Sequence, residues 1–377
     1  MSLYSKYLTE DEQLIIDAAE EFRSDVLEPR VMTDLEREIC PMDVLEQMRE
    51  LGFTNASVPE EAGGFGGSMT LQCALDATIS QASLAMAFMG CSNPIATLLA
   101  RVGTPEQIEL FMPGLLSGQG GLGFTEPNAG SDSSGITTTA VKDGDEWVIN
   151  GQKTFISYIN VFDYFLVSAL TNETEPGGAS VFLVHKDTPG FKVGSMFHKI
   201  GLHGSNTGEL FFEDMRVPAI NMIGKENHGL RYVLAVLDSC RLANAACAIG
   251  IAQGALEKAT MFAKQRVTFG KPICKHQGIS WYFAEMEARL SAARSLVFDV
   301  ARDCDEGKNI TAGAAKAKWI AGQTAMFVTD RAIQICGGYG LTEDFGVARL
   351  FRDARVIPIV EGTDEVLKIV ISRDVLK

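Results

Sequence analysis

The sequence predicts an α+β fold that is mostly α-helical, with an N-terminal helical domain, a middle β-barrel-like domain and a C-terminal four-helix bundle. Two observations support this prediction. Apolar residues recur at helical spacing up to about residue 115 and again after residue 229. Between residues 120 and 228, short apolar runs alternate with turns rich in Gly, Pro, Asn and Asp. We therefore expect three domains, at 1–119, 120–228 and 229–377.

The N-terminal helices follow from two apolar patterns. Residues at helical spacing open the chain: Leu14, Ile15, Ala18 and Phe22. A second, longer helical run extends over 69–89, after a glycine-rich break at 63–67. We expect both runs to pack within one helical domain.

The remaining elements are short strands followed by long helices. The expected strands are 146–150, 164–169, 179–185 and 209–212. The expected bundle helices are 229–264, 277–305, 312–334 and 364–376. The first of these helices carries a stripe of small residues, Ala243, Ala246, Gly250 and Gly254. Such a stripe allows a neighbouring helix to approach closely.

Composition narrows the class of protein. The chain has 377 residues, of which 46% are hydrophobic, and its net charge is −15. This acidic balance argues against a nucleic-acid partner and against a basic membrane-binding surface. Loops and helix ends can still bind an anionic ligand. We identify neither a signal peptide nor a membrane-spanning segment, so we expect no membrane insertion.

The cysteines and histidines indicate neither disulfides nor a metal. None of the eight cysteines forms a CxxC pair, and all lie in apolar or helical surroundings. Reduced thiols in the core of a cytoplasmic enzyme are the simplest interpretation. The five histidines have no metal-binding spacing, so we expect no metal site.

A candidate catalytic base lies near the C-terminus, in the segment Ile359-Val360-Glu361-Gly362-Thr363. Thr363 can cap the helix that follows, which places Glu361 on a loop held by a helix. A base that must reach a buried carbon needs such a support. The alternative interpretation is a glutamate on a solvated turn.

Four motifs occur in order along the chain. They are Phe124-Thr125-Glu126-Pro127-Asn128-Ala129-Gly130-Ser131-Asp132; Lys153-Thr154-Phe155-Ile156-Ser157; Arg266-Val267-Thr268-Phe269-Gly270-Lys271 followed by Gln277; and Gln334-Ile335-Cys336-Gly337-Gly338-Tyr339-Gly340 followed by Arg352-Asp353-Ala354 and the Glu361 segment. In their order and spacing, these motifs resemble the flavin-dependent acyl-CoA dehydrogenase family over essentially the whole chain. The resemblance implies the three-domain fold that the periodicity also predicts.

The resemblance implies removal of hydrogen from Cα and Cβ of an acyl-CoA thioester, which yields a trans-2-enoyl-CoA. Glu361 would be the base that takes the α-proton. FAD would accept the β-hydride, because no side chain can. The backbone N–H of Glu361 and a flavin ribityl hydroxyl would polarise the thioester carbonyl. Electrons would then pass to an electron-transfer flavoprotein.

The resemblance also assigns binding residues. Those expected at the flavin are Phe124, Thr125, Gly130, Ser131, Phe155, Ser157, Arg266, Phe269, Gln277, Gln334, Gly337, Gly338 and Thr363. Those expected at the acyl-CoA are Ser131, Asp238, Arg241, Val360, Glu361 and Gly362. Arg266 would bind the flavin diphosphate of a neighbouring subunit, which implies a homo-oligomer, usually a tetramer.

Several of these residues have simpler interpretations. Phe155 could be ordinary core packing, and Ser131 could belong to a surface turn. Gly337 and Gly338 could only cap a helix. Arg241 could form an exposed ion pair with Asp238 on one helix.

The activity has alternatives as well. The same site could run in reverse as an enoyl-CoA reductase, or it could pass electrons to oxygen as an oxidase. A non-catalytic CoA-binding relative is the alternative from another class of protein, and retention of Glu361, Thr125 and Arg266 argues against it.

Some positions depart from the common family pattern. Val360 replaces a frequent tyrosine, Tyr158 and Ile159 follow Ser157 where Asn-Gly is frequent, and Leu367 and Lys368 replace a Gln-Arg pair. The smaller Val360 predicts a reshaped acyl pocket and a branched, cyclic or aryl-bearing acyl group. The stretch 83–93 contains no Lys or Arg, which disfavours an acyl chain that ends in a carboxylate.

Overall fold

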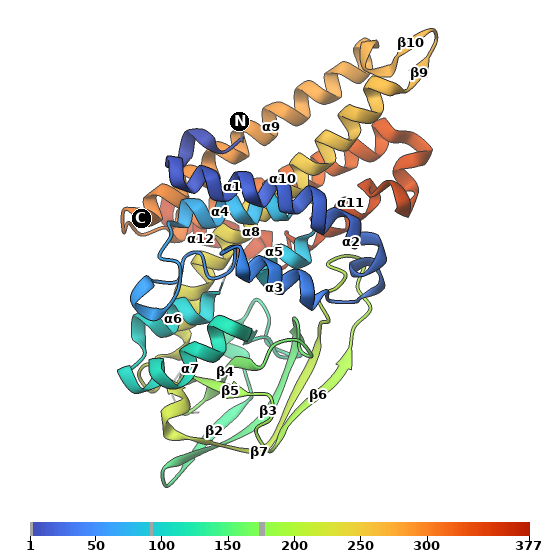
Figure 1. The fold of residues 1–377 in the computed structure, drawn as a ribbon. Helices are drawn as coiled ribbons and strands as arrows, with labels where there is room; N and C mark the ends of the chain where they lie inside the picture. Colours follow the sequence, from blue (N-terminus) through green and yellow to red (C-terminus); the bar gives the residue numbers. More distant parts are fainter. Residues whose placement is uncertain (1–2, 91–92, 119, 173–177) are drawn as a thin grey trace.

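The computed structural model describes residues 3–90, 93–118, 120–172 and 178–377. Figure 1 shows helices of the N-terminal third, a twisted sheet at one end of the molecule, and long C-terminal helices that extend away from the sheet. The predicted mostly helical α+β fold is confirmed.

The N-terminal helices surround one buried helix, α4. Thr9 caps α1 through a capping box with Glu12, which satisfies free N–H groups of its first turn. Every residue of α4 from Thr70 to Ile79 is buried, because α4 packs against α1, α8 and α9. The helices of this region are α1 (Glu10–Phe22), α2 (Glu28–Thr33), α3 (Met42–Glu50), α4 (Met69–Ile79), α5 (Leu84–Gly90), α6 (Pro94–Val102) and α7 (Pro105–Gly118).

The middle region is one sheet in which β7, β3, β2 and β4 are successive neighbours. Its two longest strands, β3 and β7, pair antiparallel with two register shifts. The strands are β1 (Gly120–Gly123), β2 (Thr139–Asp143), β3 (Glu146–Ile156), β4 (Tyr164–Leu170), β5 (Ala179–His185), β6 (Phe191–Met196), β7 (Gly208–Pro218) and β8 (Met222–Ile223).

The sequence did not predict four of these strands. β1 is mostly glycine, and β6 has no buried residue, so neither shows an apolar alternation. β2 has one buried residue and β8 has only two residues. The predicted strands 146–150 and 209–212 are too short, because β3 and β7 continue past their bulges.

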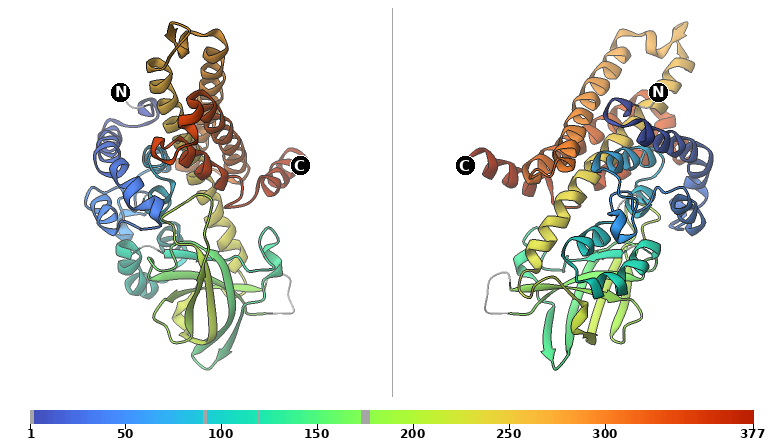
Figure 2. Two further views of the ribbon diagram at one scale, coloured as in Figure 1. Left: turned by 90° about the vertical axis from the view of Figure 1, so that its right-hand side faces the viewer. Right: turned by 60° about the vertical axis from the view of Figure 1, so that its left-hand side comes forward.

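The C-terminal bundle differs from the prediction in its fourth helix. Its helices are α8 (Gly229–Gln265), α9 (Gln277–Asp305), α10 (Thr311–Cys336) and α11 (Val347–Val356), and α12 (Asp364–Val375) follows them. α11 packs on both α8 and α10, whereas α12 packs on α10 and leaves the bundle (Figure 2). The prediction that 364–376 completes the bundle was therefore wrong. The fourth helix of the bundle is α11, which the sequence did not predict because it is short and rich in arginine.

The small-residue stripe on α8 brings the N-terminal and C-terminal helices together. A Cβ atom on Gly250 would lie 2.2 Å from the carbonyl oxygen of Ala77, and one on Gly254 would lie 2.7 Å from that of Gln81. The predicted close approach is confirmed, and its partner is α4 with the turn after it. By length and composition α8 could cross a membrane, but 67% of its apolar window is buried inside the protein. Packing in the core accounts for that composition.

Substitution of Gly250 by alanine should destabilise the protein. The added methyl group must displace the backbone of α4, which costs about 1–3 kcal/mol. Chemical denaturation of Gly250→Ala measures the loss. Gly278→Ala is the matched control, because nothing lies within 4 Å of its added Cβ. Equal stability of the two variants would contradict the close approach.

Candidate active site

Glu361 lies in the turn between α11 and α12, as the sequence predicts. The hydroxyl of Thr363 accepts a hydrogen bond from the backbone N–H of Val366 and caps α12. Glu361 and Gly362 both have left-handed backbones, with φ of 53° and 97°. A left-handed glutamate persists only where its surroundings fix it.

Two buried cations fix this turn through its backbone. Nε of Arg241 donates to the carbonyl oxygen of Glu361 at 3.1 Å. Nζ of Lys318 donates to the carbonyl oxygen of Gly362 at 2.7 Å. Arg241 comes from α8 and Lys318 from α10, so the turn is fastened to two helices of the bundle. We call these two hydrogen bonds the cationic clamp.

Arg241 also forms an ion pair with Asp238 at 3.0 Å. The interpretation of this pair as an exposed one is wrong, because Arg241 is buried. Asp238 accepts a further hydrogen bond from Thr311 at 2.6 Å, which joins α8 to the start of α10. Both predicted residues thus support the Glu361 turn.

The carboxyl group of Glu361 is available for chemistry. Glu361 is half-buried, and the loss of water around its carboxyl raises the pKa, while the charges of Lys318 and Arg241 lower it in part. Within the part of the chain that the structure describes, no hydrogen bond or ion pair reaches this carboxyl, and the N–H of Glu361 donates to no acceptor. A carboxylate with a raised pKa is a stronger base, and the free N–H can donate to a ligand.

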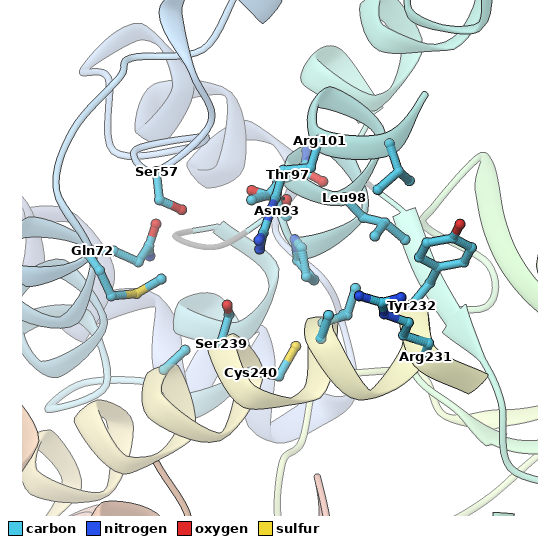
Figure 3. Close-up of a pocket in the computed structure, with 16 residues that line it drawn as sticks. Ser57, Gln72, Asn93, Thr97, Leu98, Arg101, Arg231, Tyr232, Ser239 and Cys240 are labelled. Carbon is cyan, nitrogen blue, oxygen red and sulfur yellow. Dashed lines mark hydrogen bonds between the residues drawn. The ribbon is translucent and has the colours of Figure 1, made fainter. Parts of the chain in front are cut away.

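A cavity of about 470 Å³ lies between α4, α6 and α8, and its lining includes Cys240, the residue before Arg241, but no residue of the Glu361 turn. Ser239 and Cys240 point into it from α8, facing the space bordered by Gln72 and Asn93 (Figure 3). Burial raises the pKa of the Cys240 thiol, and the charge of Glu361 raises it further. The cavity wall is therefore electrostatically coupled to the candidate base.

Cations do border this cavity, although the stretch 83–93 supplies none. Arg101 on α6 and Arg231 on α8 both line it, and both are exposed. Sequence reasoning missed them because they lie outside the stretch that it considered. The absence of Lys and Arg from 83–93 therefore does not by itself exclude an acyl chain that ends in a carboxylate.

The first group of predicted flavin residues meets where β1 and β3 end. The backbone N–H of Thr154 donates to the carbonyl oxygen of Thr125 at 2.9 Å, which joins the two segments. Phe155 is 66% exposed and left-handed, and its ring lies 5.0 Å from that of Phe197. Core packing is therefore the wrong interpretation of Phe155. An exposed ring held on a strained backbone suits contact with a flat ring system.

The other members of this first group surround that position. Phe124 and Ser157 are partly buried. Gly130 and Ser131 are exposed on the loop after β1, where Asp132 accepts a hydrogen bond from the N–H of Ser134. This loop can present backbone N–H groups to an anion.

A buried ion pair that no sequence pattern indicated supports the flavin loop. Nζ of Lys153 lies 2.7 Å from Oε1 of Glu126, and both side chains are buried. Burial alone would raise the pKa of Glu126, but Lys153 and hydrogen bonds from Thr137 and Thr138 hold it at about 2. Burial lowers the pKa of Lys153 to about 8. The pair ties the loop of Thr125 to the strand of Phe155.

The second group of predicted flavin residues lies elsewhere in the chain. Arg266, Phe269, Gly337 and Gly338 line a hollow of about 620 Å³ at the tip of α8. Gly337 also caps α10 with a bond from its N–H to Ile333, so the helix-cap interpretation is confirmed. Gln277 and Gln334 are exposed and do not line the hollow.

The hairpin at this tip, β9 (Val267–Thr268) and β10 (Lys271–Pro272), lies far from the sheet in Figure 1. The structure of one chain therefore does not bring the two flavin groups together. Phe269 at the hairpin turn is 96% exposed and left-handed.

Removal of the Lys153 ammonium should unfold the middle region more easily. The substitution Lys153→Met leaves the Glu126 carboxylate buried without its cation, which costs about 3–5 kcal/mol. Denaturation at neutral pH measures the loss. The control is Lys192→Met, which breaks the exposed pair with Glu213 in the same sheet and should change stability little. Equal effects would contradict the anchoring role.

Comparisons with known proteins identify the family of this chain. Models of the N-terminal, middle and C-terminal domains of acyl-CoA dehydrogenase match residues 9–119, 121–215 and 227–376. The chain is 40% identical to "Acryloyl-CoA reductase (NADH)" of Anaerotignum propionicum, over 98% of this chain and 95% of that one.

Two solved structures match with a TM-score of 0.95 and 38% identity, each over 98% of this chain and 99% of the other. One is butyryl-CoA dehydrogenase from Megasphaera elsdenii, and the other is named "Electron transferring flavoprotein of Acidaminococcus fermentans: Towards a mechanism of flavin-based electron bifurcation". With all three domain models matched in order, the chain belongs to the acyl-CoA dehydrogenase family.

Proposed function

We propose that this protein is an FAD-dependent acyl-CoA dehydrogenase, which converts an acyl-CoA to a trans-2-enoyl-CoA and passes the electrons to an electron-transfer flavoprotein. One observation carries the proposal: a Glu361 carboxyl with a raised pKa and no partner among the described residues, on a turn that the cationic clamp fixes. The family and the protein names above agree with it.

The residues present fit a flavin. The exposed ring of Phe155, the hydroxyls of Thr125 and Ser157, and the exposed turn of Gly130 and Ser131 would hold it on the middle domain. When bound, FAD supplies the acceptor for the hydride from Cβ.

The chain's own residues handle the proton. Glu361 takes the proton from Cα, and its raised pKa makes it a stronger base than an exposed carboxylate. The free N–H of Glu361 is available to donate to the thioester oxygen, which favours the enolate-like state. The cationic clamp keeps both groups of Glu361 in place.

The reverse reaction is the second candidate function. The relative from Anaerotignum propionicum is named a reductase, whereas the Megasphaera elsdenii structure is named a dehydrogenase. One site can serve both directions, because the base that removes the α-proton also returns it. Reduction of enoyl-CoAs by the reduced flavoprotein distinguishes the two.

The activity test uses Glu361→Gln under anaerobic conditions. The variant should keep FAD and bleach it at least about 100-fold more slowly than the wild type, because it lacks the base. The panel contains short straight, branched, cyclic and aryl-bearing acyl-CoAs, since Val360 predicts a reshaped pocket. Glu365→Gln is the control, because Glu365 is exposed on the next turn. Unchanged bleaching by Glu361→Gln would refute the assignment.

A homotetramer is the assembly that we propose. The separation of the two flavin groups within one chain supports it, because a second copy can supply Arg266 and Phe269 to the flavin of the first. The almost complete exposure of Phe269 also supports a missing partner.

Disruption of the hairpin tip tests this assembly. In sedimentation experiments Phe269→Asp should give smaller particles that release FAD, because the charge cannot enter an apolar contact. Val141→Asp is the control, since Val141 is an exposed hydrophobic residue on β2. Retention of both the tetramer and the flavin by Phe269→Asp would contradict the proposal.

We also propose a cytoplasmic location. No disulfide joins any two of the seven cysteines in the described ranges, which supports a reducing compartment. Cys91 lies outside the described residues.

A further inference from the structure

Lys318 is a fully buried lysine with no carboxylate partner among the described residues. Its side chain lies on α10 at 0% exposure, and its one hydrogen bond to the residues that the structure describes is the 2.7 Å bond to the carbonyl oxygen of Gly362. A buried ammonium that pairs only with a backbone carbonyl is costly. We therefore expect the buried ammonium of Lys318 to have a role beyond packing.

The charges around the Glu361 turn come from three helices. α8 contributes Arg241, Asp238 and the Cys240 thiol, α10 contributes Lys318, and α12 contributes Asp364 and Glu365. Asp238 is engaged by Arg241 and Thr311, and one oxygen of Asp364 accepts a hydrogen bond from the side-chain amide of Gln323, while its other oxygen has no partner among the described residues. Lys318 interacts with Asp364 and with Glu361 through its charge, and it holds the turn through its hydrogen bond to Gly362.

We propose that Lys318 is a positioning residue for the base: its ammonium holds the Gly362 carbonyl, and its charge favours the ionised form of the Glu361 carboxyl. This inference rests on the proposed function, in which Glu361 takes the α-proton. Arg241 performs the parallel task from α8, on the carbonyl of Glu361. Together the two cations hold the backbone of the turn and favour the charged form of its one carboxylate.

The titration of both groups agrees with this role. Burial lowers the pKa of Lys318 to about 8, although Asp364 and Glu361 raise it in part. Lys318 is therefore mostly protonated at neutral pH. Burial raises the pKa of Glu361, and Lys318 is the largest influence that opposes this rise.

The test compares Lys318→Met, Lys318→Gln and Lys318→Arg in the FAD-loaded enzyme. The rate of anaerobic flavin bleaching, measured as a function of pH, should fall on the acidic side as Glu361 becomes protonated. We call this fall the acidic limb of the pH profile. Without the Lys318 charge the pKa of Glu361 should rise, so the limb should move upward by about one pH unit. Lys318→Arg should restore most of the wild-type position. Lys318→Gln serves if the methionine variant does not fold.

Gln323→Leu is the matched control. It removes another side chain of α10 that fastens this region, by its 2.6 Å bond to Asp364, but it removes no charge. A purely structural role for Lys318 predicts that Gln323→Leu and Lys318→Met alter stability alike and leave the limb in place. A charge role predicts that only the Lys318 variants move it.

A second measurement does not depend on turnover. The infrared carboxyl band of Glu361, identified by its loss in Glu361→Gln, reports the protonation of this residue directly in the oxidised enzyme. The pKa read from it should rise in Lys318→Met and not in Gln323→Leu. An unshifted band and limb in an active enzyme would overturn the inference, whereas absence of bleaching by the wild type with every acyl-CoA would overturn the proposed function instead.

Discussion

The geometry of the site depends on the cationic clamp. A glutamate with a left-handed backbone is strained, and the backbone hydrogen bonds of the turn between α11 and α12, from Val360 to Val356 and from Asp364 to Pro358, do not involve Glu361. Arg241 and Lys318 supply the missing support by donating to consecutive carbonyl oxygens. Because both cations are buried, they bond strongly and also act on the nearby carboxyl through a medium of low dielectric constant. The same two cations therefore fix the position of the base and oppose the rise in its pKa that burial causes.

The clamp in turn requires closely packed helices. Arg241 can reach the turn only if α8 is fixed, and α8 is fixed where Gly250 and Gly254 allow the backbone of α4 to approach it. The same helix supplies Ser239 and Cys240 to the cavity wall. A single helix thus links the N-terminal helices, the cavity and the base, which explains why most of its central residues are buried.

In the middle domain a buried ion pair, and not the cationic clamp, holds the site residues in place. The Glu126–Lys153 pair joins the loop after β1 to strand β3. The backbone N–H groups of Thr137 and Thr138 donate further hydrogen bonds to the Glu126 carboxylate. A fully satisfied buried pair gives a defined geometry even where it adds little net stability. It joins the segments of Thr125 and Phe155 where β1 and β3 end. The residues of the proposed flavin surface are therefore held together by contacts within the protein itself.

The sequence by itself determined the order of the three regions, the long helices α8, α9 and α10, and the placement of Glu361 on a capped turn. Periodicity and capping are local properties, so a linear pattern contains them. Tertiary structure decided the fourth bundle helix, the extent of β3 and β7, and the partners of Glu361. Lys318 stands 43 positions before Glu361 and Lys153 stands 27 after Glu126, and no local pattern marks either lysine as buried. Their roles arise only because folding removes them from water and leaves few oxygen atoms within reach: those of Glu126 and Ser168 for Lys153, and that of Gly362 for Lys318.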